Sequence, residues 1–384
     1  MLDRILQKSG GRPALIGTVT HRIGSKVYEA VNTTPGKEVL AVYLREAERQ
    51  NLDSVIMEVS SHALVQGRAD DVPIRYAAFL NLTQDHLDYH RTMEEYYAAK
   101  KKLFDFKTLF TAIINIDDEY GKRLAEELTA EKSFRILTFT LDEEKKDATF
   151  QARVLSAGFE GSRFELSYPK PSEGRLGVQE FFLPRPGRHH IVDAVCASAL
   201  AFASGGSRMI ETASEALSDF PGAPGRFEVL RSEAKNLTAI CDYAHTPDAL
   251  ENLLRTVREI RESSTSNKRG RIITVFGCGG DRDKGKRPLM GRIAGVMSDY
   301  TIITSDNPRN EDPLDIIGEI EEGIYETAAG YSVTADRRSA ITRAVMLARP
   351  GDIIVVAGKG HETYQIVGNR KKHFDDREVL KELL

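Results

Sequence analysis

Short apolar runs alternate with segments of helical pattern along most of this chain, and this alternation restricts the fold more than any other feature. Strand-like runs occur at residues 54–59, 77–82, 111–116, 135–140, 238–243, 271–276, 301–305 and 352–357. Helical patterns occupy residues 36–50, 92–104, 247–262 and 288–298. Strands that are apolar almost throughout are typical of sheets covered on both faces. The alternation therefore predicts an α/β protein with parallel, doubly wound sheets.

The length and punctuation of the chain indicate two domains. Its 384 residues exceed one typical domain, and its 41% hydrophobic and 29% charged residues are typical of globular proteins. Residues 219–226 are dense in proline and glycine, which places a boundary there. We predict one doubly wound domain at residues 1–221 and a second at 222–384. Residues 147–184 have a more irregular, β-like pattern, which predicts an antiparallel edge.

Charge, cysteine usage and hydropathy exclude several classes of protein. The net charge of −4 argues against general nucleic-acid binding. The three cysteines, Cys196, Cys241 and Cys278, are too widely spaced for a disulfide framework or a metal knuckle, and they indicate a reducing compartment. No apolar run approaches the ~18 residues of a membrane span, and the N-terminus lacks the apolar core of a secretory signal. We predict a cytoplasmic protein without nucleic-acid or membrane partners.

The tetrapeptide Asp306-Asn307-Pro308-Arg309 directly follows the strand-like run 301–305. Proline fixes its own φ and biases the preceding residue toward an extended conformation, so the cluster keeps one shape. An arginine fork suits a carboxylate, and the aspartate suits an amine. The tetrapeptide is either an ordinary polar turn or a site that grips both charged ends of an amino acid.

Polar turns also follow the other runs of the second domain. Gly277-Cys-Gly-Gly-Asp-Arg-Asp-Lys-Gly-Lys-Arg287 precedes Pro288, which we expect to open a helix. Position 287 is Arg, not the Ser or Thr of a phosphate-binding GxxxxGK[ST] loop, and the chain contains no complete copy of that motif. We interpret the segment as an anion-contacting loop at a helix start. The other turns are Asp242-Tyr-Ala-His-Thr-Pro-Asp248 and Gly358-Lys-Gly-His-Glu362; together they would meet at one sheet edge.

Two strand ends in the first domain carry metal-binding residue types. Glu58 lies in the apolar run, where a carboxylate is costly unless a cation or donor meets it. It is either a paired core carboxylate or a Mg²⁺ ligand. Asp85, His86, Asp88 and His90 crowd the next strand end. The i,i+4 histidines lack an HExxH pattern, so zinc is weakly supported.

Lys100 falls on the apolar stripe of the helix that the capping box Thr92-x-x-Glu95 opens. Apolar surroundings should lower its pKa. A neutral amine can capture CO₂ and form a carbamate, an anionic oxygen ligand for Mg²⁺. The alternative is a lysine that reaches solvent along its stem.

Taken together, these motifs resemble the Mur ligases, and within them the branch that adds 2,6-diaminopimelate. The resemblance covers essentially the whole chain. Its carriers are Asn32-Thr-Thr-Pro, Met57-Glu-Val-Ser-Ser-His, Asn81-Leu-Thr-Gln-Asp-His-Leu-Asp-Tyr-His, Ala98-Ala-Lys100, Ala223-Pro-Gly-Arg, Asp242-Tyr-Ala-His-Thr-Pro-Asp, the glycine-rich segment from Gly277 to Met290, Asp306-Asn-Pro-Arg and Gly358-Lys-Gly-His-Glu.

The resemblance implies a role for each matching residue. Asn32, Thr33, Thr34, Ser60, Gln66 and Arg68 would bind UDP-MurNAc-L-Ala-D-Glu. Glu58, His86 and carbamylated Lys100 would form the catalytic magnesium site. Arg282, Asp306, Asn307, Pro308, Arg309, Gly358 and Glu362 would bind meso-diaminopimelate, and Asp242 and His245 would lie at the nucleotide.

The resemblance also implies amide formation driven by ATP with Mg²⁺, in a monomer that serves peptidoglycan precursor synthesis. The γ-phosphoryl group would move to the D-glutamate side-chain carboxylate, and the amine of diaminopimelate would attack the acyl phosphate. Magnesium and cationic groups offset charge on the transferring group.

Three departures from the family pattern set further expectations. The family's N-terminal domain and its Gly-Thr-Asn-Gly-Lys-Thr loop are absent from the printed sequence, and residues 2–10 resemble the end of a helix. We therefore expect residues upstream of Met1, and little ligase activity from the chain as given. His190 and Asp193 replace family asparagines near the base. The alternatives are an inactive remnant that still binds the amino acid, and a folylpolyglutamate synthetase relative, against which Asp306-Asn-Pro-Arg309 argues.

Overall fold

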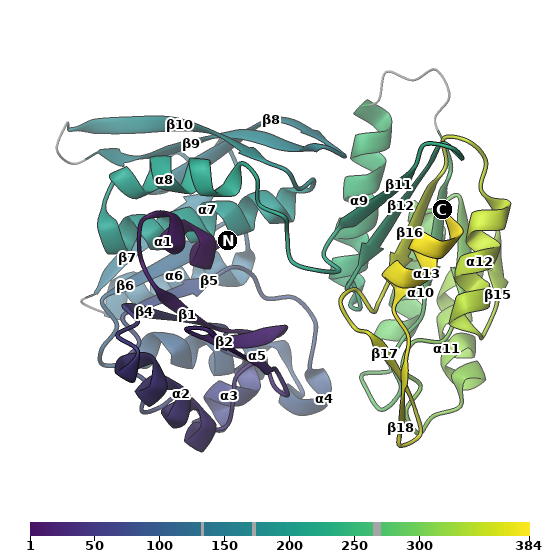
Figure 1. The fold of residues 1–384 in the computed structure, drawn as a ribbon, viewed down its shortest axis with the longest axis horizontal. Coiled ribbons are helices and arrows are strands. Elements are labelled where there is room, and N and C mark those ends of the chain that lie inside the picture. The colour runs from purple at the N-terminus through teal and green to yellow at the C-terminus, as the bar shows by residue number, and fades with distance from the viewer. Residues whose placement is uncertain (132–133, 171–173, 264–269) are drawn as a thin grey trace. The chain divides into compact units, whose positions relative to one another are not determined.

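A computed structural model describes residues 1–131, 134–170, 174–263 and 270–384. Contacts divide the chain into two compact units (Figure 1). Unit 1 comprises Met1–Leu82, His90–Pro184 and Arg188–Phe220, and unit 2 comprises Thr83–Tyr89, Arg185–Gly187 and Pro221–Leu384. The main division, between Phe220 and Pro221, lies within the proline- and glycine-rich segment 219–226.

The first sheet of unit 1 is small and mixed. Its strands lie in the order β3-β2-β1-β4, where only β1 and β4 are parallel. They are β1 (Pro13–Ile16), β2 (Thr20–Ile23), β3 (Lys26–Glu29) and β4 (Ser54–Met57). Helix α2 (Lys37–Arg49) buries Leu40 and Ala47 against Ala14, Ile16 and Ile23. The antiparallel hairpin of β2 and β3 that follows β1 was not predicted from the sequence.

The second sheet of unit 1 has the order β10-β9-β8-β7-β6-β5. Its strands are β5 (Tyr76–Phe79), β6 (Thr111–Asn115), β7 (Arg135–Thr140), β8 (Phe150–Gly158), β9 (Gly161–Lys170) and β10 (Arg175–Leu183). The strands from β5 to β8 are parallel, whereas β8, β9 and β10 are antiparallel. The antiparallel edge predicted at residues 147–184 is thus confirmed, although residues 171–173 lie outside the described part of the chain.

Helices cover both faces of the second sheet. Neighbouring residues of β6 show this, because Ile113 packs with helices α7 and α8 while Ile114 packs with α5 and α6. The helices of unit 1 not yet given are α1 (Leu2–Lys8), α3 (Ser61–Val65), α5 (Met93–Lys101), η1 (Lys102–Asp105), α6 (Glu119–Glu131), α7 (Arg188–Gly205) and α8 (Arg208–Leu217). α4 (Leu87–His90) crosses the boundary between the units.

Unit 2 is built on a sheet in the order β11-β12-β16-β13-β14-β15. Its strands are β11 (Glu228–Ser232), β12 (Leu237–Asp242), β13 (Ile272–Phe276), β14 (Tyr300–Ile303), β15 (Tyr331–Val333) and β16 (Ile353–Ala357). Every pair is parallel except β11 with β12. All residues of β13 and β16 are buried, because helices lie on both faces, as the all-apolar sequence pattern predicts.

The helices of unit 2 are α9 (Pro247–Ser263), α10 (Lys286–Met297), α11 (Pro313–Tyr325), α12 (Arg337–Leu347) and α13 (Asp376–Leu383); a separate hairpin pairs β17 (Tyr364–Val367) with β18 (Arg370–His373). Each helix from α9 to α12 connects two successive strands, whereas α13 follows the last strand. Helices α12 and α13 pack on one face of the sheet through Ile341 and Leu380. No helix in the described ranges is long and apolar enough to cross a membrane.

The strand order of unit 2 places four turns at one edge of the sheet. Strand β16 lies between β12 and β13, so the order of the parallel strands reverses at a crossover beside β13. The carboxyl ends of parallel strands at such a crossover form the usual ligand crevice of open α/β sheets. The turns after β12, β13, β14 and β16 contain all the polar motifs predicted for the second domain.

Candidate functional site

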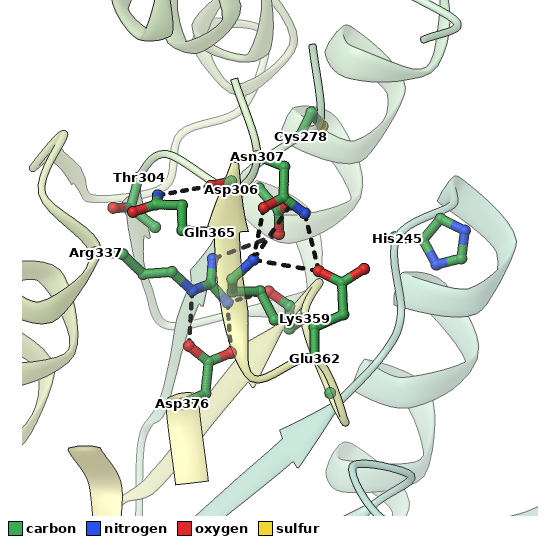
Figure 2. Close-up of polar contacts among 12 residues, drawn as sticks. His245, Cys278, Thr304, Asp306, Asn307, Arg337, Lys359, Glu362, Gln365 and Asp376 are labelled. Carbon is green, nitrogen blue, oxygen red and sulfur yellow. Dashed lines mark hydrogen bonds and ion pairs between the residues drawn. The ribbon is translucent and has the colours of Figure 1, made fainter. Parts of the chain in front are cut away.

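The turn after β14 is buried, and its polar atoms contact the protein itself. The Asn307 amide nitrogen donates to Glu362 Oε2 (2.8 Å). Its Oδ1 accepts from Lys359 Nζ (3.0 Å) and from the Ile366 backbone N–H (2.9 Å). Figure 2 shows Asn307 above Lys359 and Glu362, joined to both. The Asn307 side chain therefore fixes the turn and orients Glu362.

The hairpin β17–β18 holds the same turn through hydrogen bonds to the backbone of the turn. Gln365 Nε2 donates to the Asp306 carbonyl (2.6 Å), and Arg309 N donates to the Ile366 carbonyl (3.2 Å). Gly368 N donates in turn to the Arg309 carbonyl (2.6 Å). Arg309 has φ 51°, a left-handed conformation that is uncommon for a residue with a side chain. The hairpin bonds on both sides of Arg309 hold it in this conformation.

Two arginines converge on the glycine-rich turn after β13. Arg309 Nη1 donates to the Gly280 carbonyl (2.7 Å). A Cβ atom at Gly279 would lie 3.0 Å from Arg309 Nη1 and 3.8 Å from Arg282 Cγ. Burial and then the charge of Arg282 lower the pKa of Arg309. Arg282 thus acts on the half-buried Arg309 guanidinium through its charge, and two positive charges at one turn favour a bound anion such as a carboxylate.

The glycine-rich turn itself is anchored by a buried arginine. Arg287 is fully buried and pairs with Glu311 (2.9 Å) and Glu319 (2.8 Å). Gly280 N donates to the Asn307 carbonyl (2.9 Å), and a Cβ at Gly280 would lie 1.9 Å from the Pro308 carbonyl oxygen. The two turns therefore interlock at a position that only glycine can occupy. We expected Pro288 to be the first residue of helix α10, but the helix begins at Lys286 and Pro288 is its third residue. Proline is tolerated there because the N–H groups of the whole first helical turn lack helical partners.

The turn after β16 adds the acidic part of the site. Gly358 has φ 115°, and a Cβ there would lie 2.8 Å from Asp306 Oδ2. Lys359 is fully buried, and its Nζ lies 3.3 Å from Glu362 Oε2 and 4.0 Å from Asp306 Oδ1. Glu362 is only 15% exposed at its side chain. The edge thus presents carboxylates next to a pair of arginines, which suits a ligand that carries both ammonium and carboxylate groups.

Comparisons with known proteins agree with this arrangement. Residues 1–201 match the model of the Mur ligase middle domain, and residues 225–360 match that of the Mur ligase, glutamate ligase domain. The chain belongs to the Mur ligase family. It is 46% identical to the UDP-N-acetylmuramoyl-L-alanyl-D-glutamate–2,6-diaminopimelate ligase of Alkaliphilus oremlandii and 41% identical to that of Clostridioides difficile. Each comparison covers 100% of this chain, and 74% and 75% of the respective relative.

Solved structures give the same Mur ligase fold. A UDP-N-acetylmuramoyl-L-alanyl-D-glutamate–2,6-diaminopimelate ligase matches with a TM-score of 0.64 at 32% identity, over 100% of this chain and 74% of that one. A pseudomurein peptide ligase type C from Methanothermus fervidus matches with a TM-score of 0.69 over 100% of this chain and 75% of its own. Its identity of 15% makes this a likeness of fold alone.

The two residues assigned to the nucleotide from the Mur ligase resemblance differ in their surroundings. The Asp242 carboxylate accepts from Phe227 N and Ala244 N (both 2.7 Å), and burial raises its pKa. It therefore ties its own turn together. His245 Nδ1 lies 2.9 Å from the Tyr243 carbonyl, and burial followed by the charge of Lys286 lowers its pKa. A neutral imidazole at pH 7 follows, and the nucleotide role of both residues stays a prediction.

The residues assigned to the UDP-linked substrate lie together in unit 1 around Thr34. The buried Thr34 hydroxyl donates to the Glu58 carbonyl (2.9 Å) and accepts from Ser60 N (3.0 Å). Arg68 donates to the Thr34 carbonyl (2.9 Å) and to Gln66 Oε1 (2.8 Å). Ser60 also caps α3 by accepting from Ala63 N. Thr33 lies beside Thr18 (3.2 Å between hydroxyls), and Asn32 is exposed.

The magnesium set predicted for this Mur ligase is only partly described by the geometry. We expected Glu58 to lie inside the strand, but β4 ends at Met57, so Glu58 is the first residue after it. Its exposed carboxylate accepts from the Thr18 hydroxyl (2.5 Å) and so is met by donors, and hard oxygen atoms of this kind suit Mg²⁺. Lys100 is half-buried with its ammonium 5.3 Å from the Tyr96 ring centroid. His86 belongs to the segment Thr83–Tyr89, which clusters with unit 2. Among the described residues, no group of three His, Cys, Asp or Glu could by itself hold a metal.

Sequence reasoning missed three residues that support the site. Lys359 was quoted in a motif without a role, although it lies between Asn307 and Glu362 (Figure 2). Asp376 lies in the terminal segment His373-Phe-Asp-Asp-Arg-Glu378, for which no role was predicted. Arg337 carries no local signal beyond the aspartate that caps its helix.

Proposed function

We propose that this chain is an ATP-dependent ligase that joins meso-diaminopimelate to UDP-MurNAc-L-Ala-D-Glu in cytoplasmic peptidoglycan precursor synthesis. One observation carries the proposal: the half-buried Arg309 guanidinium lies at Gly279 under the charge of Arg282, and the oriented carboxylate of Glu362 belongs to another turn of the same sheet edge. Meso-diaminopimelate has two carboxylates and two ammonium groups, so it can use both the cationic and the acidic part.

Arg309 and Arg282 would hold the distal carboxylate of the amino acid, and Glu362 would accept from its ammonium group. Asp306, Asn307, Pro308 and Gly358 would set the positions of these groups. Because the side chains are fixed by internal hydrogen bonds before a ligand arrives, binding loses little conformational freedom. The attacking amine would thereby be presented in one orientation, which is the proximity contribution to catalysis.

In unit 1, Ser60, Arg68 and the Thr33–Thr34 segment would bind the UDP-linked dipeptide. The carboxylate of its D-glutamate would accept the γ-phosphoryl group of ATP, and the acyl phosphate would then react with the amine. Mg²⁺ held by Glu58, His86 and carbamylated Lys100 would offset charge on the transferring phosphoryl group.

Binding of the amino acid to the full chain tests the proposal. Isothermal titration with meso-diaminopimelate should show saturable binding at one site per chain, with L-lysine at least about tenfold weaker because it lacks the distal carboxylate. Equal affinities for the two amino acids, or no binding of either, would overturn the assignment.

A second candidate is a chain that binds the amino acid without completing the ligation. ADP release from the chain with ATP, Mg²⁺, the dipeptide precursor and meso-diaminopimelate separates the two functions, because only a ligase transfers the γ-phosphoryl group. Robust release that depends on both substrates would establish the ligase in this chain itself.

A further inference from the structure

The side chain of Arg337 is buried between the amino-acid site and the last helix of the chain. Its Nε and Nη2 donate to the two oxygens of Asp376, each at 2.7 Å. Both residues are fully buried at their side chains. Figure 2 shows the two parallel contacts, with Asp376 at the start of α13 below the guanidinium. This bidentate geometry fixes the orientation of the guanidinium plane.

The other side of the same guanidinium faces two turns of the site. Arg337 Nη2 donates to the Ala357 carbonyl (2.9 Å), directly before Gly358. Arg337 Nη1 lies 3.9 Å from Asp306 Oδ2. Within the described ranges, neither Arg337 Nη1 nor Asp306 Oδ2 has a hydrogen-bond partner, although both atoms are buried. The arginine thus contacts the turn after β16 and faces the carboxylate of the turn after β14.

Arg337 belongs to a cluster of charged side chains that includes residues of the amino-acid site. Its described members include two cations, Arg337 and Lys359, and three carboxylates, those of Asp306, Glu362 and Asp376. Asp376 neutralises Arg337, so Asp306 and Glu362 share Lys359 and also interact with the charge of Arg309. Burial opposes the charge on Arg337, but Asp376 and Asp306 together raise the pKa of the guanidinium.

We propose that Arg337, held by Asp376, is a positioning residue that sets the Asp306 carboxylate and the Ala357–Gly358 backbone for amino-acid binding. This inference rests on the proposed function of the same site. It gives the C-terminal helix α13 a part in substrate recognition, because Asp376 is its first residue. The alternative is an ion pair that only attaches α12 and α13 to the sheet.

Replacing both partners by apolar residues separates the two roles. A buried ion pair is often replaced by apolar residues of similar volume without loss of stability, whereas removing one partner is strongly destabilising. We expect Arg337→Met alone to lower the melting temperature and Arg337→Met with Asp376→Leu to recover most of it. The double variant should still bind meso-diaminopimelate about tenfold more weakly than the unaltered chain, which corresponds to one lost hydrogen bond of a charged group.

A matched pair in the same unit provides the control. Arg271 and Asp352 form another arginine–aspartate pair (2.7 Å), at the opposite ends of β13 and β16 from the site. Arg271→Met with Asp352→Leu should leave the affinity for meso-diaminopimelate within about twofold. Asp376→Asn is a second test that preserves volume; it should weaken binding while the calorimetric stoichiometry, which reports the folded fraction, stays unchanged.

The outcomes distinguish the two proposals. If the unaltered chain does not bind meso-diaminopimelate, the proposed function fails and the positioning role falls with it. If the unaltered chain binds and both the double variant and Asp376→Asn retain its affinity, only the positioning role is overturned. Weaker binding by the double variant or by Asp376→Asn at unchanged stoichiometry, with the control pair unaffected, supports it.

Discussion

Replacement of Arg309 by alanine should separate recognition of meso-diaminopimelate from recognition of lysine. Both amino acids carry two amines, but only meso-diaminopimelate carries a second carboxylate for the arginine pair. Arg309 is half-buried, and its Nη1 already donates to Gly280 at 2.7 Å. The remaining donors of the guanidinium fork are the ones that we assign to the ligand.

The magnitude follows from the number of charged hydrogen bonds removed. Such a bond contributes about 1.5–3 kcal/mol, which corresponds to about 10- to 150-fold in affinity. Arg282 remains next to Gly279 and retains part of the attraction, so a loss near tenfold for meso-diaminopimelate is expected. The affinity for L-lysine should change by less than about twofold, because the acidic part of the site is intact.

Isothermal titration of the full chain with both amino acids measures this ratio. Arg309→Gln retains an amide donor for the Gly280 carbonyl and should show a similar loss, which separates the role of charge from that of loop anchoring. Arg292→Ala is the surface control, because Arg292 is 65% exposed and pairs with Glu326 at 3.5 Å, a contact of little energetic value. An equal loss for both amino acids, or an unchanged affinity for meso-diaminopimelate, would refute the distal-carboxylate role of Arg309.

Three further predictions concern stability. Gly358→Ala should lower the free energy of unfolding by about 1–3 kcal/mol in urea titrations and weaken amino-acid binding, because Gly358 has φ 115° and a Cβ there would lie 2.8 Å from Asp306 Oδ2. The control is Gly318→Ala in α11, where a Cβ meets open space and the change should be neutral or stabilising. Equal effects of the two substitutions would contradict the reasoning. Phe139→Ala should lower the free energy of unfolding by about 3–5 kcal/mol, since Phe139 is fully buried. Phe110 is 54% exposed, so Phe110→Ala should change the free energy of unfolding by less than about 1 kcal/mol. A melting temperature unaffected by Phe139→Ala would contradict the placement of Phe139 in the core of unit 1. The Arg287 hydrogen bond, opposed by burial, lowers the pKa of Glu311 to about 2. The ionised Glu311 carboxylate therefore stabilises the fold fully above about pH 4.5, and this stabilisation disappears as the pH falls toward 2. Glu311→Gln should reduce the acid-induced loss of stability between pH 6 and 3, and an unchanged loss would exclude this contribution.

The parallel core of each unit could be predicted from the sequence because burial on both faces leaves an apolar run. Strand β7 has the predicted bounds, and β13 and β16 differ from theirs by one residue at the start. The hairpin formed by β2 and β3 was missed for the opposite reason. Its strands have four residues each, and β3 is largely exposed, so it lacks both the length and the apolar pattern on which such predictions depend.

The site could be predicted as a set of turns but not as a network. Each motif follows its own strand, and the parallel topology brings the strand ends together. The partners across the network are far apart in sequence, since 39 residues separate Arg337 from Asp376 and 55 separate Asn307 from Glu362. Spacing along the chain carries no information on such pairs. For the same reason, no local pattern showed that the Asp242 carboxylate points at the backbone of Phe227.

The internal use of Asn307 changes how the tetrapeptide should be understood. If its amide orients Glu362 and binds Lys359, then the tetrapeptide selects its ligand mainly by holding Arg309 and Glu362 at a fixed separation. Affinity shared by meso-diaminopimelate and lysine would come from the acidic part, and discrimination would come from the arginine pair. Fixing both groups in advance lowers the conformational cost of binding. A variant that loosens the turn should therefore weaken both amino acids, whereas loss of the Arg309 charge should weaken only the one with two carboxylates.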